Sequence, residues 1–258
     1  MPRQAAARIA CPQFERPRTV ARRGMQDADA NRTHARESSD HFGRDGLAGR
    51  RVRAYIGLGA NVGDPERTLA EAVHALAALQ GAHVRGVSRL YATAPVGVTD
   101  QPEFRNAVAA LDVPGGPDPE LGALDLLTAL KELERVFGRR RRRRWGPREL
   151  DLDLLIFGRA QISLERPEAA RSMDAETDPV KAAQLLRVPH PAAADRLFVL
   201  APLADLAPGL IPPGWHETVE TARRRQASVE APDAIRPLGD WDAIEGRWRR
   251  TSAAPQPR

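Results

Sequence analysis

The sequence predicts an α+β fold of the ferredoxin-like type: a βαββαβ core with a four-stranded sheet, helices packed on it, and further C-terminal helices. Two observations predict this fold. Several short segments alternate apolar residues with others, which is typical of strands. Two longer segments between them repeat apolar residues at helical spacing. The order along the chain is strand, helix, strand, strand, helix, strand.

The first three elements are a strand, a helix and a second strand. Apolar residues alternate with others over residues 51–58, which predicts the first strand. Asp64 is a typical N-cap and Pro65 a typical first-turn residue, and the apolar stripe after them predicts a helix that runs to Gly81. The second strand is expected at about residues 83–92.

The next three elements repeat this order. A strand is expected over residues 104–113, after a loop of Pro and Gly residues. Asp118 and Pro119 repeat the cap arrangement in front of a second amphipathic helix, which is expected to stop at Gly138. The fourth strand is expected from about Leu150, directly after an arginine-rich loop.

Three segments are expected to differ from this core. Residues 1–50 lack apolar periodicity and a secretory signal, so we expect a disordered N-terminal extension. The folded domain is expected over residues 51–227, with a polar insertion at 165–183. An apolar helix around 196–206 is expected to cover the free face of the sheet. The C-terminal tail, 228–258, is expected to be flexible or loosely packed.

Composition places the chain among globular proteins, with 42% hydrophobic and 28% charged residues. No apolar stretch approaches the length that crosses a bilayer. The single cysteine, Cys11, excludes a disulfide framework and a cysteine-based metal site, and it fits a reducing, cytoplasmic setting. Six consecutive arginines at 139–144 concentrate positive charge in one loop, which would attract an anion.

Two carboxylates in the fourth strand are the strongest functional signal. Asp151 and Asp153 point to the same face of the strand, because strand side chains alternate, while Leu150, Leu152 and Leu154 take the other face. Like charges on an inner strand repel each other unless a cation lies between them. Mg²⁺ is usually held by one or two carboxylates together with phosphates. The pair, beside arginines that bind phosphates in a bidentate manner, predicts a magnesium–nucleotide site.

Other functions could use the same features. A metal-dependent glycosyltransferase uses an Asp-x-Asp motif, although only about 100 folded residues precede the pair here. A non-enzymatic, arginine-rich nucleic-acid-binding module would use residues 139–144 to contact phosphates, but the Asp pair would repel that partner. A P-loop kinase is excluded, because the chain has no Gly-x4-Gly-Lys sequence. Core packing is the alternative for Phe104 and Phe198, and a structural position for His190.

Five ordered blocks between residues 52 and 215 resemble the 6-hydroxymethyl-7,8-dihydropterin pyrophosphokinase family of folate biosynthesis. The most specific block is Arg144-Trp145-Gly146-Pro147-Arg148-x-x-Asp151-Leu152-Asp153-Leu154-Leu155. The others are Tyr55-Ile56-Gly57-Leu58-Gly59-x-Asn61, Thr93-x-Pro95-Val96-Gly97, Asp100-Gln101-Pro102-x-Phe104-x-Asn106, and Val188-Pro189-His190 followed by Arg196 and Phe198. The chain departs from the family pattern at Ala60, Ala94, Arg187 and Pro191.

The resemblance implies ATP-dependent transfer of a diphosphate group to the hydroxymethyl group of 6-hydroxymethyl-7,8-dihydropterin, with release of AMP. It implies two Mg²⁺ ions on Asp151 and Asp153 and ATP as co-substrate. The enzyme is expected to be a cytoplasmic monomer that acts on small molecules and binds neither nucleic acid nor membrane.

The resemblance also implies a set of site residues. The catalytic residues would be Arg139, Arg141, Arg148, Asp151 and Asp153. The ATP-binding residues would be Glu134, Arg139, Arg148, Leu154, His190 and Arg196. The pterin would contact Thr93, Val96, Phe104, Asn106, Trp145 and Phe198, with the two phenylalanines stacking on the ring, Asn106 at its edge and Trp145 sealing the site.

Overall fold

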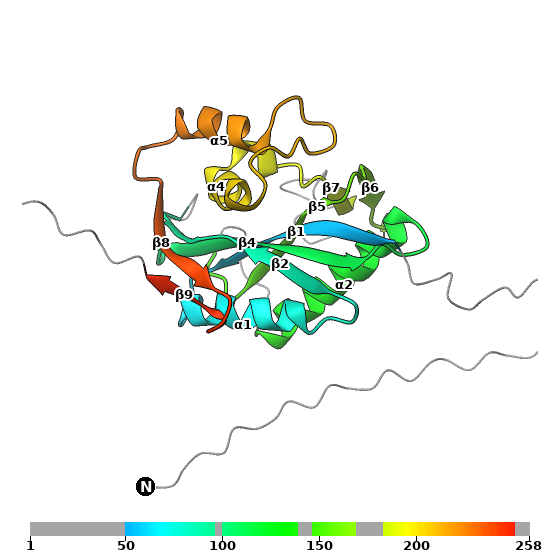
Figure 1. Cartoon of the computed structure of the whole chain (residues 1–258), viewed down its shortest axis with the longest axis horizontal. Coiled ribbons are helices and arrows are strands. Elements are labelled where there is room, and N and C mark those ends of the chain that lie inside the picture. The colour runs from blue at the N-terminus through cyan, green and yellow to red at the C-terminus, as the bar shows by residue number, and fades with distance from the viewer. Residues whose placement is uncertain (1–49, 96–99, 139–145, 169–182, 251–258) are drawn as a thin grey trace, which may run out of the picture. The chain divides into compact units, whose positions relative to one another are not determined.

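An antiparallel sheet of seven strands forms the centre of the described structure (Figure 1). The computed structural model describes residues 50–95, 100–138, 146–168 and 183–250. The predicted N-terminal extension, the arginine loop at 139–144 and most of the insertion at 165–183 lie outside these residues.

The order of the strands in the sheet is β5-β1-β4-β3-β8-β9, and β2 also pairs with β4. The bounds of these strands are β1 (Arg51–Ala60), β2 (His83–Val87), β3 (Leu90–Thr93), β4 (Phe104–Pro114), β5 (Asp151–Phe157), β8 (Ile235–Asp242) and β9 (Arg247–Arg250). A separate antiparallel pair is formed by β6 (Ile162–Glu165) and β7 (Gln184–Val188).

Helices lie on both sides of the sheet (Figure 1). On one side, α1 (Pro65–Ala77) and α2 (Pro119–Val136) pack against it. On the opposite side lie α4 (Leu197–Leu206), preceded by the short 3₁₀ helix η3 (Ala193–Asp195), and α5 (Val219–Ala227). Of the helices that the structure describes, none is long and apolar enough to cross a membrane.

The predicted caps start both helices of the core. The Asp64 carboxylate accepts a hydrogen bond from the backbone N–H of Arg67 at 3.2 Å, and Asp118 accepts one from Leu121 at 2.9 Å. These bonds satisfy backbone donors that a helix start leaves unpaired. The first helix ends at Ala77 and so is shorter than predicted, because the predicted end, Gly81, belongs to the turn before β2.

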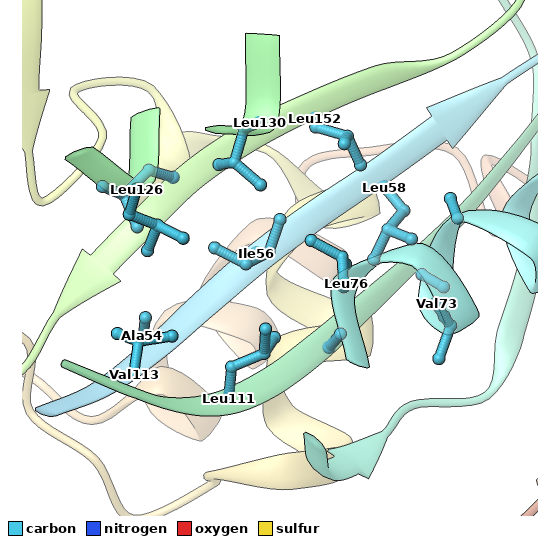
Figure 2. Packing of buried hydrophobic residues seen from close by; sticks show 14 of the residues in the cluster. Ala54, Ile56, Leu58, Val73, Leu76, Leu111, Val113, Leu126, Leu130 and Leu152 are labelled. Carbon is cyan, nitrogen blue, oxygen red and sulfur yellow. The ribbon is translucent and has the colours of Figure 1, made fainter. Parts of the chain in front are cut away.

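The main hydrophobic core lies between the sheet and the helices α1 and α2. Every second residue of β1, including Ile56 and Leu58, points into it (Figure 2). These side chains meet Leu76 of α1 and Leu130 of α2, and Ile56, Leu76 and Leu130 are fully buried. Burial of each such side chain contributes about 1.5–3 kcal/mol to stability.

The predicted count of four strands is wrong, because the described sheet has seven. The predicted second strand divides into β2 and β3, and both pair with β4. Ser88 lies at the division: its hydroxyl accepts a hydrogen bond from the backbone N–H of Val108, and its own N–H donates to the Val108 carbonyl. Ser88 thus stays bonded to β4 where β2 ends and β3 has not yet begun.

The prediction of a flexible tail is wrong for residues 235–250. In this segment β8 pairs with β3, and β9 pairs with β8. Trp241 and Trp248 contact each other edge to face, with ring centroids 4.7 Å apart, and the Trp248 indole donates to the Ser88 carbonyl at 2.8 Å. Both rings pack against the main core, and contacts between segments so distant in the chain leave no local pattern in the sequence.

An ionic triad joins three neighbouring strands. Arg53 of β1 and Arg85 of β2 each donate to one carboxylate oxygen of Asp112 on β4, at 2.6 and 2.5 Å. The hydrogen bonds from Arg53 and Arg85 lower the pKa of Asp112 to about 2. The carboxylate therefore stabilises the fold above the pKa of an unfolded Asp, about 4, and this contribution is lost as the pH falls through about 2.

We predict that Asp112→Asn lowers the midpoint of thermal unfolding at pH 7 by about 2 °C, because both arginines are half exposed and the bonds are partly screened. The difference from the parent protein should shrink as the pH falls from 4 to 2. Thermal unfolding monitored by circular dichroism across this range tests it, with Asp125→Asn on the exposed face of α2 as the control. A difference that stays constant with pH would contradict the prediction.

Candidate functional site

A pocket of about 450 Å³ lies between the sheet and the segment that runs from β7 to α4. Strands β1, β4 and β5 form its floor, and residues 184–187 and 190–192 line one wall. The start of α4, with Phe198 and Val199, lines another wall. The pocket therefore combines segments from both halves of the chain.

The Asp pair points into this pocket. Asp151 and Asp153 both line it. Leu150, Leu152 and Leu154 are buried in the core on the α1–α2 side, and Leu154 also borders the pocket. The predicted division of the strand into a carboxylate face and a leucine face is therefore confirmed.

The strand loses this alternation directly after the pair. Ile56 pairs with Leu154 and Tyr55 with Ile156, so Leu155 is an extra residue in β5. As a result, Leu155 and Ile156 both belong to the cluster on the α4–α5 side. The bulge therefore places an apolar side chain, Leu155, in the pocket lining next to the carboxylates.

Two glycines on β1 leave the floor beside the carboxylates bare. Gly59 pairs with Asp151 and Gly57 with Asp153. A Cβ atom on Gly59 would lie 3.3 Å from Oδ1 of Asn106 on β4. Any larger side chain on these two residues would enter the space that a ligand of the carboxylates needs.

Arg148 supplies a cation next to the pair. Its Nη1 donates to Oδ1 of Asp151 at 2.9 Å, and both side chains are about 30% exposed or less. The guanidinium offsets part of the negative charge, while its remaining N–H groups can reach an anion in the pocket. Arg148 and Asp151 both line the pocket.

Asn61, at the end of β1, fixes the position of Arg148. Its Oδ1 accepts from the Arg148 backbone N–H at 2.7 Å, and its own N–H donates to the Arg148 carbonyl at 3.0 Å. Its Nδ2 donates to Gln101 Oε1 and to the Pro102 carbonyl, both at 3.1 Å. Sequence reasoning gave Asn61 no role, although the Gly59-x-Asn61 block contains it.

Polar and aromatic groups gather at the β3–β4 end of the pocket, where Thr93, Asn106 and Phe104 line it. The Asn106 amide donates to Thr93 Oγ1 at 2.8 Å, and both residues are buried. This bond fixes the amide and leaves its oxygen as an acceptor. Of the other residues expected at a pterin, Phe198 lines the pocket, whereas Val96 and Trp145 lie outside the described residues.

Arg196 and Phe198 form a joined pair in the pocket wall. The guanidinium carbon of Arg196 lies 5.6 Å from the centre of the Phe198 ring, a cation–π contact. Because Arg196 was expected at the nucleotide and Phe198 at the pterin, the two expected subsites adjoin here.

The far end of α4 is held by Asp205, which accepts from Arg89 at 2.6 Å and from the Tyr91 hydroxyl at 2.9 Å.

The remaining residues expected at the nucleotide differ in their placement. His190 and Leu154 line the pocket, and the His190 backbone N–H donates to the Leu155 carbonyl at 2.8 Å. Glu134 does not line the pocket: it is 2% exposed and lies between α2 and β5. The expected Arg139 and Arg141 lie outside the described residues.

Cations that sequence reasoning did not assign also line the pocket. Lys131 comes from α2, Arg166 follows β6, and Arg187 belongs to β7. Among the described lining residues, these three with Arg148 and Arg196 make five cationic side chains against two carboxylates. The signal for Arg187 was its place directly before the Val188-Pro189-His190 block. The pocket is therefore suited to a ligand with several negative charges.

The donor set fits Mg²⁺ only together with such a ligand. Among the described residues, no group of three or more His, Cys, Asp or Glu side chains could hold a metal ion. Two carboxylates on one strand are, however, the usual protein share of a magnesium site whose other ligands are phosphate oxygens and water. Asp151 and Asp153 therefore suit a metal that arrives with a polyphosphate.

Comparisons with known proteins agree with this chemistry. The family model described as 7,8-dihydro-6-hydroxymethylpterin-pyrophosphokinase matches residues 55–208. The 2-amino-4-hydroxy-6-hydroxymethyldihydropteridine pyrophosphokinase of Pseudomonas aeruginosa is 42% identical over 165 residues, which is 64% of this chain and 86% of the relative. The protein of the same name from Methylorubrum extorquens is 42% identical over 171 residues, 66% and 91% of the two chains.

Solved structures show a similar fold. A Plasmodium falciparum HPPK-DHPS triple mutant with pteroate matches with a TM-score of 0.57 and 14% sequence identity. The match covers 80% of this chain and 49% of the other. At this identity the likeness concerns the fold alone.

We predict that Asn61→Ala lowers the free energy of unfolding by about 1–3 kcal/mol, because it removes the hydrogen bonds that the buried Asn61 amide makes to Arg148, Gln101 and Pro102. Urea denaturation at equilibrium measures this change. Gln101→Ala, which removes only one of these bonds, should cost less than half as much. Equal effects of the two substitutions would show that the Asn61–Arg148 connection contributes nothing of its own.

Proposed function

Because the chain belongs to the 7,8-dihydro-6-hydroxymethylpterin-pyrophosphokinase family, we propose that it transfers a diphosphate group from ATP to 6-hydroxymethyl-7,8-dihydropterin in folate biosynthesis. The observation that carries the proposal is the Asp151–Asp153 pair, which faces a strongly cationic pocket. The hydroxymethyl oxygen attacks the β-phosphorus, the bond from this phosphorus to the oxygen of the α-phosphate breaks, the hydroxyl proton is released, and AMP departs.

Asp151 and Asp153 would hold two Mg²⁺ ions, which neutralise phosphate charge and make the attacking hydroxyl more acidic. The bare floor at Gly57 and Gly59 supports this assignment, since it leaves room directly beside both carboxylates. Arg148 keeps Asp151 in place through the hydrogen bond at 2.9 Å.

The cationic wall would bind the phosphates. Arg148 and Arg196 would contact them, and Arg166 and Arg187 also line the pocket, while His190 and Leu154 would border the nucleotide. Transfer of a phosphoryl or diphosphoryl group depends mainly on positioning and on charge stabilisation, for which fixed guanidinium groups are suited. The catalytic roles of Arg139 and Arg141 stay predictions.

The end of the pocket at β3 and β4 would bind the pterin. Phe104 and Phe198 would stack on its flat ring, and the fixed amide of Asn106 would hydrogen-bond its edge, with Thr93 as support. The contact between Arg196 and Phe198 supports this arrangement, because it joins a residue proposed for the phosphates to one proposed for the pterin, so that the two substrates would lie side by side. The roles of Val96 and Trp145 stay predictions.

We propose further that the enzyme is a cytoplasmic monomer that acts only on small molecules. The pocket supports the small-molecule part of this proposal, since its volume of about 450 Å³ is in the range of small-molecule sites. The segment from β1 to β5 would be a ferredoxin-like unit, which the β5-β1-β4 order with β2 and β3 beyond β4 supports. The family favours this function over a glycosyltransferase or a nucleic-acid-binding module.

We predict that the purified protein with ATP, Mg²⁺ and 6-hydroxymethyl-7,8-dihydropterin releases AMP and forms the pterin diphosphate, because the β-phosphorus is the point of attack. Chromatography of the nucleotides measures the products, and a reaction without pterin is the control. Release of ADP, or of AMP without pterin, would refute the proposed function.

We predict that Asp153→Ala keeps the fold and lowers the turnover rate by at least about 100-fold, as expected when a group that stabilises charge during reaction is lost. Steady-state rates and the thermal unfolding midpoint measure the two effects. Asp125→Ala, exposed on α2, is the matched control. A variant that unfolds at room temperature would instead assign Asp153 a structural role.

A further inference from the structure

The strand that carries the Asp pair lies at the edge of the described sheet. In the order β5-β1-β4-β3-β8-β9, β5 has β1 on one side and no strand on the other. The backbone N–H and C=O groups of an edge strand that point away from the sheet lack partners within it. Such groups cost free energy when they are buried and unpaired.

Two side chains of α2 provide hydrogen-bond partners for these backbone groups at one residue, Leu152. Its backbone N–H donates to Oε1 of Glu134 at 2.7 Å, and its carbonyl accepts from Nζ of Lys131 at 2.9 Å. The same two side chains bond to each other at 2.8 Å. Lys131 and Glu134, three residues apart on the helix, thus provide the donor and the acceptor that a neighbouring strand would provide.

Leu152, the residue held in this way, lies between Asp151 and Asp153 in the sequence. Its side chain faces the core, next to Leu130 of α2 (Figure 2). Asp151 and Asp153 pair with glycines on β1, so no β1 side chain supports either carboxylate from that strand. Their direction depends on the backbone of β5, which Lys131 and Glu134 hold at Leu152, and for Asp151 also on the hydrogen bond from Arg148.

We propose that Lys131 and Glu134 are positioning residues, which clamp Leu152 so that Asp151 and Asp153 face the metal–nucleotide complex together. The inference rests on the proposed function for the identity of that complex. It also accounts for Glu134, which is buried outside the pocket. Lys131 connects the clamp to the site, because its side chain is 45% exposed and lines the pocket.

If Lys131 and Glu134 had a purely structural role, they would only attach α2 to the sheet. The helix offers a matched control in Glu132 and Arg135, an ion pair with the same spacing at 2.6 Å. Its side chains are 59% and 75% exposed. Removal of that pair changes the charge and stability of α2 without touching Leu152.

The test measures the binding of Mn²⁺ to the full-length protein in the presence of a non-hydrolysable ATP analogue, by electron paramagnetic resonance. Lys131→Met and Glu134→Ala should each weaken Mn²⁺ binding about tenfold, the effect of one unpaired hydrogen-bonding group. Lys131→Arg, which keeps a cationic donor, should stay within about twofold of the parent protein. Glu132→Ala should bind like the parent.

A second measurement follows the clamp without any ligand. Hydrogen exchange of the Leu152 amide, observed by NMR, should become faster in Glu134→Ala but not in Glu132→Ala. Where Glu134→Ala does not fold, Glu134→Gln replaces it, because Gln loses the charge that binds Lys131 but keeps an acceptor for Leu152. The Gln variant should then show weaker Mn²⁺ binding with a protected amide.

Mn²⁺ binding within twofold of the parent in both Lys131→Met and the Glu134 variant, with only a lower unfolding midpoint, would overturn the inference. Failure of the proposed function looks different, since the parent protein itself would then show no nucleotide-dependent Mn²⁺ binding. In that case the exchange of the Leu152 amide still decides whether the clamp exists.

Discussion

Repulsion between the carboxylates of Asp151 and Asp153 is the constraint that organises the site. Two like charges on one face of a strand are unfavourable unless cations oppose them. Arg148 opposes this charge, because its Nη1 lies 2.9 Å from Oδ1 of Asp151. Most of the charged residues described in the pocket lining are also cationic. The glycines of β1 complete the arrangement, since they leave space for a metal and its phosphates.

The same sheet serves stability and function on its two faces. On the α1–α2 face, alternate residues of β1 and β5 belong to the main hydrophobic core. On the other face, Gly57, Gly59, Asp151 and Asp153 line the pocket, as do Phe198 at the start of α4 and Arg196 directly before it. The bulge at Leu155 marks the point where β5 changes from a polar to an apolar lining on this face.

Local patterns predicted most of the core, because caps, helical stripes and strand alternation depend on near neighbours in the chain. Asp64 and Asp118 cap the helices as expected. The patterns failed where pairing is long-range. Trp241 and Trp248 lie in the tail that was expected to be flexible, yet they pack on the main core within β8 and β9, because strand pairing depends on the partner strand.

The sequence alone determined the order of the core elements and the shared face of Asp151 and Asp153, because a two-residue spacing in a strand has one geometric outcome. Through the resemblance to the family, it also predicted ten site residues that line the pocket. Only the tertiary structure decided which groups surround the pair. Asn61, Lys131 and Glu134 act on residues from other elements, and such contacts depend on how helices and strands pack, which no short segment encodes.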